Sequence, residues 1–257
     1  MSESVLEFKN VSFSYQNDKN QRIAMIEGLN LQIHDGEFVS IIGPSGSGKS
    51  TIFRLITGLE QPGEGGIFLN GKQTDNRLGI VGYMPQQDLL MPWRTIMENA
   101  VLPLEIKGVK NAAAEAQVRV LLKDFGLNGV ENKLPGDLSG GMKQRVSFLR
   151  TVLSGSNILL LDEPFSALDA ITRLSMQEWL LEQWEKRQKT ILFITHDVDE
   201  ALFLSDRIFV LQQHPISTLQ VVEVPLERPR SVRDLSRAEV VQLKEHLIDQ
   251  LRSRMKA

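Results

Sequence analysis

Apolar and polar positions alternate along two early segments of the chain, 5–15 and 29–33. A period of two is typical of strands with one buried and one solvated face. Segments 38–42, 158–161 and 190–194 are instead almost continuously apolar. Such strands are usually buried on both faces, as in a parallel sheet covered by helices. The pattern predicts an α/β core in which helices flank a parallel sheet, with a small antiparallel β subdomain beside it.

The period changes to a helical one between residues 95 and 127. Val118, Leu121, Leu122 and Phe125 fall on one helical face, and Thr95 begins a segment that resembles a capping box. We therefore expect a helical subdomain inserted into the core. The predicted division of this single domain is 1–86 and 154–230 for the α/β core, 87–153 for the helical subdomain and 231–257 for a C-terminal helix.

Composition narrows the possible classes of protein. The 257 residues are 42% hydrophobic and 24% charged, with a formal net charge of −3 and no cysteine. Disulfides, thiolate metal sites and thiol nucleophiles are excluded, and the charge is not that of a general nucleic-acid binder. No apolar run approaches the roughly 18 residues of a membrane span, and residues 1–4 are too polar for a secretory signal. Any role at a membrane is expected to require a partner.

The segment from Gly43 to Thr51 fits the pattern G-x-x-x-x-G-K-[ST] and lies between an apolar strand and a helix. Glycines let backbone N–H groups turn around an anion, and the helix N-terminus adds partial positive charge. Lys49 can reach terminal phosphates, and the Ser50 hydroxyl can bind Mg²⁺. The alternative is a glycine-rich turn followed by a chance lysine. The flanking strand and helix favour a phosphate-binding loop.

Polar side chains follow several of the predicted strands. Gln86 follows an apolar run, Asp162 and Glu163 follow the strand at 158–161, and His196 follows the strand at 190–194. Ligand sites of parallel sheets lie at the carboxyl ends of the strands. We expect Asp162 to hold Mg²⁺ directly or through water, and Glu163 to orient or deprotonate an attacking water. A lone histidine is usually structural, but this position suits a sensor of the γ-phosphate.

Three further segments have both a structural and a functional interpretation. Ser139-Gly140-Gly141 opens a helix and could bind an anion, although by itself it is more typical of a simple capped helix. Tyr15 could stack on a purine, although a tyrosine at a sheet edge more often packs within the sheet. The apolar loop 89–93 is either buried or exposed for another protein, because aromatic residues and methionine are enriched at interface cores.

These motifs together identify a resemblance. The phosphate loop, Gln86, Ser139-Gly140-Gly141, Asp162-Glu163, the segment 166–169 and His196 stand in the order seen in ATP-binding cassette (ABC) ATPases. The resemblance covers nearly the whole chain. It is strongest to importer ATPase subunits of the nitrate, sulfonate and taurine group, because of segments 89–95 and 162–169. Close relatives in that group carry a thiamine-precursor pyrimidine.

The resemblance implies ATP and Mg²⁺ as cofactors and a role for each motif. Tyr15 stacks on adenine, Glu163 is the general base and His196 contacts the γ-phosphate. Residues 139–141 bind ATP held by a second subunit, since such ATPases work as head-to-tail dimers. The implied catalytic residues are Lys49, Gln86, Glu163 and His196; the implied metal ligands are Ser50, Gln86 and Asp162. The implied nucleotide-binding residues are Tyr15, Gly43, Pro44, Ser45, Gly46, Ser47, Gly48, Lys49, Ser50, Thr51, Gln86, Ser139, Gly140, Gly141 and Asp169.

The function expected from the resemblance is that of a peripheral ATPase on the cytoplasmic face of the cell membrane. It acts as a homodimer, with integral permease subunits and, indirectly, an extracytoplasmic solute-binding protein. Two other classes of protein share a phosphate loop of this kind. A soluble ABC ATPase acting on nucleic acid is expected to carry long coiled-coil insertions or basic surfaces, and this sequence has neither. A small-molecule kinase with a phosphate loop would not explain residues 139–141 or His196. The sequence does not name the solute.

Overall fold

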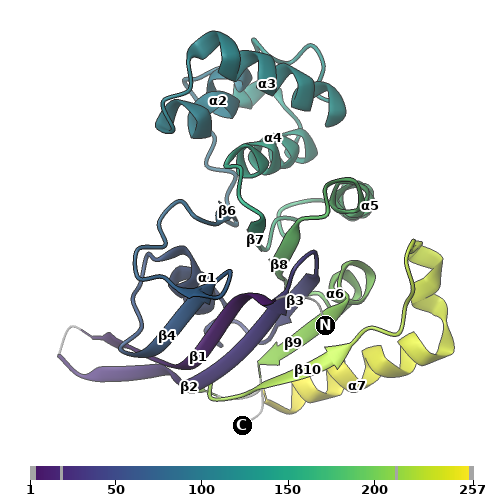
Figure 1. Cartoon of the computed structure of the whole chain (residues 1–257). Helices are drawn as coiled ribbons and strands as arrows, with labels where there is room; N and C mark the ends of the chain where they lie inside the picture. The colour runs from purple at the N-terminus through teal and green to yellow at the C-terminus, as the bar shows by residue number, and fades with distance from the viewer. Residues whose placement is uncertain (1–3, 18–19, 212–213, 255–257) are drawn as a thin grey trace. The chain divides into compact units, whose positions relative to one another are not determined.

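A computed structural model of the protein describes residues 4–17, 20–211 and 214–254 (Figure 1). The chain forms two compact units. Unit 1 consists of Met1–Leu78 and Leu181–Ala257, and unit 2 is Gly79–Leu180. Residues 1–3 of the polar N-terminal segment, which the sequence predicts not to be a secretory signal, lie outside the described residues.

Unit 1 begins with an antiparallel sheet in the strand order β2-β1-β4-β5. These strands are β1 (Ser4–Gln16), β2 (Arg22–His34), β4 (Glu64–Leu69) and β5 (Lys72–Gln73). Phe8 of β1 lies opposite Leu31 of β2, and both side chains are buried. The predicted antiparallel β subdomain is therefore present, with strands longer than the alternating segments.

The second sheet of unit 1 contains strands in the order β10-β9-β3-β8. They are β3 (Phe38–Ile42), β8 (Thr190–Ile194), β9 (Arg207–Leu211) and β10 (Leu219–Glu223). β3 pairs in parallel with β8 and with β9, whereas β10 is an antiparallel edge strand. Every residue of β3 and β8 is buried. The continuously apolar segments correctly predicted this parallel sheet.

Three α-helices of unit 1 accompany the second sheet: α1 (Lys49–Thr57), α6 (Val198–Leu204) and α7 (Ala238–Arg254). Val198 and Leu202 of α6 share one buried cluster with Ile42 of β3 and Leu247 of α7. The predicted C-terminal helix at 231–257 begins only at Ala238, after the 3₁₀ helix η2 (Val232–Ser236). Residues 255–257 lie outside the described residues.

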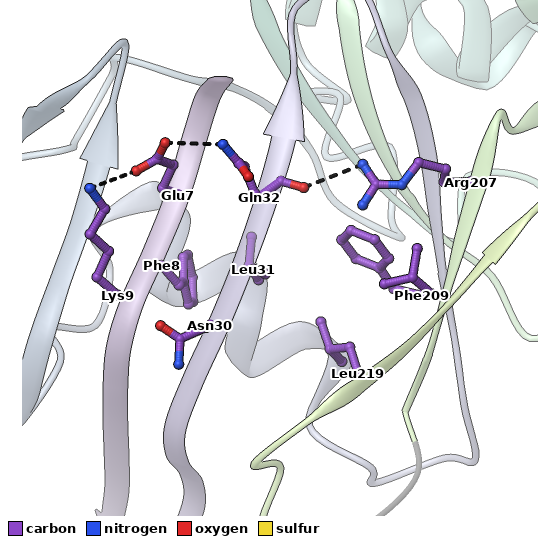
Figure 2. A pocket seen from close by; sticks show the side chains of 10 residues that line it. Glu7, Phe8, Lys9, Asn30, Leu31, Gln32, Arg207, Phe209 and Leu219 are labelled. Atoms are coloured by element: carbon purple, nitrogen blue, oxygen red, sulfur yellow. Dashed lines mark hydrogen bonds and ion pairs between the residues drawn. The ribbon is translucent and has the colours of Figure 1, made fainter. Parts of the chain in front are cut away.

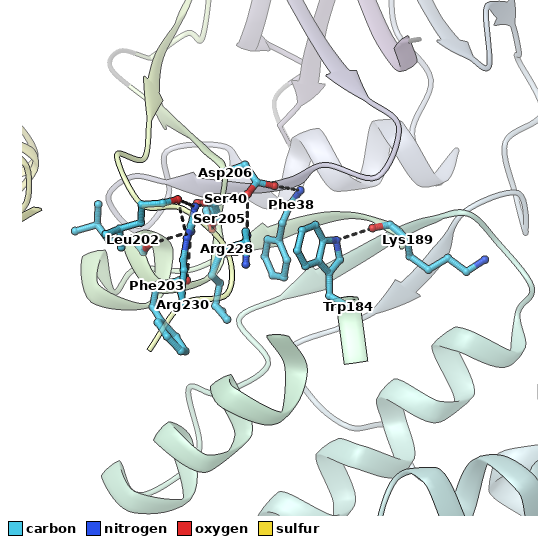
Figure 3. A network of polar contacts seen from close by, with 12 residues as sticks. Phe38, Ser40, Trp184, Lys189, Leu202, Phe203, Ser205, Asp206, Arg228 and Arg230 are labelled. Carbon is cyan, nitrogen blue, oxygen red and sulfur yellow. Dashed lines mark hydrogen bonds and ion pairs between the residues drawn. The ribbon is translucent and has the colours of Figure 1, made fainter. Parts of the chain in front are cut away.

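A buried arginine fixes the chain that leads to α7 (Figure 3). The Arg230 side chain is 1% exposed and donates to the carbonyls of Ser205 at 2.6 Å and Leu226 at 2.8 Å. Arg228 pairs with Asp206 at 2.8 Å, and the other Asp206 oxygen accepts from the Phe38 N–H at 3.0 Å. Burial lowers the pKa of Arg230 to about 10, so the guanidinium stays charged near neutral pH. These bonds fasten the end of α6 and the following segments to the first residue of β3.

Unit 2 contains a short parallel pair of strands, β6 (Gly82–Met84) and β7 (Ile158–Asp162). Most of its helices lie between these two strands in the sequence, and one follows β7. The helices are α2 (Ile96–Ile106), α3 (Asn111–Asp124), the 3₁₀ helix η1 (Pro135–Asp137), α4 (Gly140–Leu153) and α5 (Ala170–Arg187), whose last turns belong to unit 1. Thr95 and Glu98 form the predicted capping box. The rings of Phe125, Phe148 and Trp179 pack at centroid distances of 5.1 to 5.9 Å. The inserted helical region predicted from the helical period is thus present.

None of the helices within the described ranges is both long and apolar enough to cross a membrane.

Candidate nucleotide site

The phosphate loop connects the buried strand β3 to α1 in unit 1. Gly46 has φ 78° and Gly48 has φ 95°, backbone angles that side-chain-bearing residues rarely adopt. A Cβ atom on Gly48 would also lie 2.8 Å from Ile216 Cδ1. These two glycines are therefore required by the turn itself. The turn brings the first N–H groups of a nine-residue helix to the mouth of the loop, which is the arrangement that binds phosphate.

Two side chains of the loop suit an anionic ligand. Lys49 Nζ donates to the carbonyls of Gly43 and Pro44, both at 2.8 Å, so its ammonium group lies over the loop. Ser47 Oγ is buried and has no hydrogen-bond partner within the described part of the chain. A buried hydroxyl without a partner is unfavourable, and a phosphate oxygen would satisfy it. The residues present fit the phosphates of a nucleoside triphosphate.

The same segment holds the expected magnesium ligand Ser50, which is exposed on the first turn of α1. Among the described residues, no three His, Cys, Asp or Glu side chains are grouped so as to hold a metal ion. Mg²⁺ commonly binds through one or two protein oxygens, with phosphate oxygens and water completing its octahedron. The Ser50 hydroxyl therefore fits Mg²⁺ that arrives with a nucleotide.

His196 is exposed at the end of β8, in a turn fixed by its neighbours. Thr195 Oγ1 donates to the buried Glu200 carboxylate at 2.6 Å and accepts from the Asp197 N–H at 3.0 Å. The Asp197 side chain in turn caps α6 by accepting from the Asp199 N–H at 2.8 Å. The sequence analysis did not single out Thr195 and Glu200. The available signal was a threonine directly before the histidine, with a glutamate five residues after that threonine.

β3 and β8 are adjacent and parallel, with Ile41 opposite Ile194. The carboxyl ends of the two strands therefore lie at the same edge of the sheet. The phosphate loop follows β3 there, and His196 follows β8. Unit 1 thus brings together the two predicted phosphate contacts that belong to it.

Tyr15, the predicted adenine contact, is half-buried near the end of β1. Its ring packs edge-on against Phe13, with centroids 4.7 Å apart and an interplanar angle of 88°. An edge-on partner leaves a ring face for another group. Its contact with adenine stays a prediction.

In unit 2, Asp162 is the last residue of β7 and is 8% exposed. Its Oδ2 accepts from the Tyr83 hydroxyl at 3.3 Å. Tyr83 lies on β6, where the parallel register places it opposite Leu160. The sequence analysis missed this tyrosine, because only strand register places it beside the carboxylate. The hydrogen bond holds one carboxylate oxygen in place at the strand end.

Glu163 follows in a left-handed conformation, with φ 45°. That region is uncommon for a residue other than glycine and costs on the order of 1 kcal/mol or more. Ser166 stabilises it by donating from Oγ to the Glu163 carbonyl at 3.0 Å. Gln86 Nε2 donates to Glu163 Oε2 at 3.1 Å and lies 3.5 Å from Ser166 Oγ. Unit 2 therefore brings Gln86 and the predicted general base together.

Ser139, Gly140 and Gly141 form the start of α4. Ser139 Oγ accepts from the Met142 N–H at 3.3 Å, which is the capping bond expected of a simple helix start. A Cβ atom on Gly141 would lie 3.0 Å from Thr172 Cγ2, so a side chain at this position would require Thr172 of α5 to shift by a few tenths of an ångström. Ser139 and Gly140 are exposed. Their contact with a nucleotide remains a prediction beside this capping role.

Asp169, the remaining predicted nucleotide contact, precedes α5 and accepts from the Thr172 N–H at 3.0 Å. Hydrogen bonds from Thr172 lower the pKa of this carboxyl. Asp169 is thus an ionised helix cap at neutral pH, and its nucleotide role is untested.

The loop after Gln86 exposes apolar side chains. Leu89 is 58% exposed and Trp93 is 76% exposed, whereas Leu90 between them is buried. Of the two interpretations of this loop, burial is wrong for Trp93. The side chain is available on the surface of unit 2.

A hollow of about 590 Å³ in unit 1 lies among β1, β2, β9 and β10 (Figure 2). It contains none of the predicted site residues. The cations at its rim are already paired, Lys9 with Glu7 at 2.9 Å and Arg207 with Glu37 at 2.8 Å. We assign it no role in nucleotide chemistry.

Comparison with known proteins decides the family. The family model described as ABC transporter matches residues 26–166. The chain belongs to the ABC transporter family. This ABC protein is 44% identical to the formylaminopyrimidine import ATP-binding protein ThiZ of Halalkalibacterium halodurans, over 93% of this chain and 92% of that protein. It is 39% identical to the aliphatic sulfonates import ATP-binding protein SsuB of Bacillus cereus, over 88% and 89%. It is 41% identical to the nitrate import ATP-binding protein NrtD of Synechococcus elongatus, over 80% and 76%.

Solved structures of ABC transporter cassettes share the fold of this chain. The ABC transporter cassette MJ0796, solved as a dimer, superimposes on 86% of this ABC protein and 100% of its own chain, with TM-score 0.74 and 31% identity. A second structure of that cassette is a dimeric post-hydrolysis state bound to ADP and Pi, with the same TM-score of 0.74. The resemblance inferred from the motifs is confirmed, and the protein is an ATPase of the ABC type.

Proposed function

We propose that this ABC protein is the ATP-hydrolysing subunit of an importer, which couples ATP binding and hydrolysis to uptake of a small solute through a membrane permease. The observation that carries the proposal is its match with import ATP-binding proteins along more than nine-tenths of both chains in the case of ThiZ. In this proposal it works as a homodimer on the cytoplasmic face of the membrane. The permease and an extracytoplasmic solute-binding protein select the solute.

The chemistry proposed for the chain is positioning and charge neutralisation. Lys49 and the N–H groups of the phosphate loop hold the phosphates and offset their negative charge. Mg²⁺, when bound with ATP at Ser50, Gln86 and Asp162, supplies further charge neutralisation. Glu163, oriented by Gln86, accepts a proton from the attacking water. His196 contacts the γ-phosphate from the end of β8.

The proposed contact with the permease is the exposed loop 89–93 together with the start of α2. Exposed apolar patches on a soluble surface usually mark a binding site, and Trp93 is 76% exposed. The loop lies directly after Gln86 in sequence. A displacement of Gln86 during ATP turnover could therefore reach the permease through one short peptide segment.

Two solute classes are proposed. The first is the nitrate, sulfonate and taurine class, supported by the identities of 39% to SsuB and 41% to NrtD. The second is a thiamine-precursor pyrimidine, supported by the higher identity of 44% to ThiZ over a larger share of the chain. Because the permease and binding protein select the solute, these identities rank the candidates without deciding between them.

Reconstitution tests the proposal. The protein is co-expressed with the permease and binding protein encoded beside its gene and placed in proteoliposomes. ATP-dependent uptake of labelled nitrate, taurine and formylaminopyrimidine is then measured, with Lys49→Ala as the inactive control. Uptake of one solute that Lys49→Ala abolishes supports the proposal. ATP hydrolysis without assembly onto any permease would refute the importer role and leave the ATPase assignment standing.

A further inference from the structure

The loop that leads from Gln86 to Trp93 has a constrained backbone. Leu89 adopts φ 46°, a left-handed conformation that is uncommon for a residue with a large side chain. Its side chain is 58% exposed, so packing of that side chain does not impose the conformation. Sparsely populated backbone angles persist where the surroundings over-determine them, and they often occur in switch regions. Contacts from neighbouring elements must therefore fix this turn.

Arg150 of α4 supplies the main contacts. Its Nη2 donates to the Asp88 carbonyl at 2.7 Å, and its Nη1 donates to the Leu89 carbonyl at 3.0 Å. Ser147, one turn earlier on the same helix, approaches the Asp88 carbonyl at 3.4 Å. A guanidinium group presents its donors in a rigid fork, so two bonds to successive carbonyls define the orientation of the peptide between them. Arg150 thus grips the strained residue of the loop.

The far side of the loop is held by α2. Asn99 is fully buried, and its side chain accepts from the Met91 N–H at 2.7 Å and donates to the Met91 carbonyl at 3.1 Å. The loop therefore has two anchors, one on α4 and one on α2. Only the α4 anchor is part of the helix that begins at the Ser139-Gly140-Gly141 turn.

The helix α4 is a direct physical link between that turn and the loop. It runs from Gly140 to Leu153 without interruption. At 1.5 Å per residue, the helix start and Arg150 are about 15 Å apart. A movement of the helix start therefore displaces the guanidinium group, and the two carbonyls that it holds follow.

The Arg150 side chain is half-buried on α4. Burial lowers the pKa of its guanidinium group, and the nearby Asp88 carboxylate acts in the opposite sense. Keeping a cation here is unfavourable unless its donors are well satisfied. A long apolar side chain would fill the same space without that desolvation cost, so the cation is better explained by the bonds that it makes to the loop.

We propose that Arg150 is a positioning residue that couples the Ser139-Gly140-Gly141 end of α4 to the conformation of the loop 88–91. ATP bound at the helix start changes the position of α4, and Arg150 carries that change to the exposed Leu89. The proposal deepens the proposed function and rests on it, because it takes residues 139–141 as a nucleotide contact and the loop as the permease contact. Arg150 itself touches neither ligand.

A spin label on the loop tests the coupling without the permease. The chain has no cysteine, so Leu89→Cys provides a unique thiol while the Leu89 carbonyl is kept. The label is studied in full-length protein carrying Glu163→Gln, in which an ATP-bound dimer is expected to accumulate. We expect ATP and Mg²⁺ to change the mobility of the nitroxide spectrum. Arg150→Met should abolish most of that change while dimer formation, followed by size-exclusion chromatography, persists.

Arg145→Met is the matched control. Arg145 is another partly buried arginine of α4, but it donates to the Phe125 carbonyl at 3.4 Å and not to the loop. This variant should keep the spectral change. If it loses the change as fully as Arg150→Met, the effect is a general loosening of unit 2 and the proposal is overturned.

Arg150→Lys covers the case in which Arg150→Met does not fold. Lysine retains the charge but donates from a single point, so it cannot hold both carbonyls in the same fork. The ATP-dependent change should be reduced with a melting temperature close to that of the parent. A full change in a folded Lys or Met variant overturns the Arg150 proposal alone. Failure of the Glu163→Gln protein to dimerise with ATP overturns it together with the proposed function.

Discussion

Gln86 Nε2 donates a hydrogen bond to Glu163 Oε2 over 3.1 Å. The two residues are 77 positions apart in the sequence, and each stands just beyond one strand of a parallel pair. The amide bonds one carboxylate oxygen and so fixes the orientation of the carboxylate. Because Ser166 also fixes the backbone of Glu163, the carboxylate is held before any substrate arrives. Preorganisation of this kind is what a general base requires.

Glu163→Gln should therefore stop hydrolysis while leaving ATP binding intact. The amide keeps the shape of the side chain and removes the proton acceptor, so we expect turnover to fall about 10²- to 10⁴-fold. Size-exclusion chromatography with ATP and Mg²⁺ should show a dimer. Glu182→Gln is the matched control, since Glu182 is an exposed carboxylate of α5 that pairs with Lys186. A Glu163→Gln protein with near-parental turnover would exclude Glu163 as the base.

A second prediction concerns the turn that carries His196. Thr195→Val removes the hydroxyl that bonds Glu200 at 2.6 Å and the Asp197 N–H at 3.0 Å. His196 should then be less well oriented, so kcat should fall roughly tenfold or more, because small displacements of positioned groups are costly. The KM for ATP should change little, since Lys49 and its loop are untouched. Thr195→Ser restores the hydroxyl and should recover activity. If kcat is unchanged in Thr195→Val, the hydrogen bonds have no bearing on His196.

The sequence predicted those parts of the molecule that depend on local pattern. Continuous apolar runs predicted β3 and β8, and the glycine spacing predicted a turn that the structure builds with Gly46 and Gly48 in left-handed conformations. The positions of Gln86 and Glu163 after apolar strands also placed them at strand ends. In each case one segment carries both the signal and the structure.

Features that depend on two distant segments were not predictable in the same way. Tyr83 reaches Asp162 because of the register between β6 and β7, and no local pattern encodes that register. Arg150 resembles any other basic residue on a helix until the loop 88–89 is placed against it. The clamp of Arg230 on the Ser205 carbonyl likewise joins residues that lie 25 positions apart in the sequence.

That clamp leads to a stability prediction. Arg230→Met removes hydrogen bonds to the carbonyls of Ser205 and Leu226 and leaves those buried acceptors without their donor. We expect a loss of about 2–3 kcal/mol in the stability of unit 1, since hydrogen bonds to charged groups contribute about 1.5–3 kcal/mol. Thermal unfolding measures the loss, with Arg22→Met at an exposed position as control. A melting temperature equal to that of the parent would show that the clamp is not stabilising.

A further prediction tests the second-subunit contact. Ser139→Arg places bulk and charge at an exposed helix start, where a neighbouring subunit's γ-phosphate is proposed to lie. The isolated subunit should still bind ATP, because the loop around Lys49 is in the other unit of the chain. Dimerisation and turnover should fail. Asn128→Arg adds the same side chain to an exposed position of unit 2 and should leave both dimerisation and turnover intact. Loss of ATP affinity in the Ser139→Arg monomer would place Ser139 in its own subunit's pocket and contradict the dimer model.

The last prediction concerns the permease contact. Trp93 is 76% exposed at the end of the loop 89–93. Hydrogen bonds from Arg150 and with Asn99 hold the backbone just before it, at Asp88 and Met91. A rigid loop that presents an aromatic side chain loses little entropy on binding, which suits an interface anchor. Truncating such an anchor typically costs about 2 kcal/mol or more, close to a 30-fold loss of affinity. Trp93→Ala should therefore abolish co-purification with the permease and uptake of the solute, while its melting temperature stays unchanged. Ile106→Ala is the matched control, because that side chain is 79% exposed at the end of α2, away from the loop. Equal loss of assembly in both variants would mean that the permease binds a broader face of unit 2. Intact assembly in Trp93→Ala would mean that it binds elsewhere.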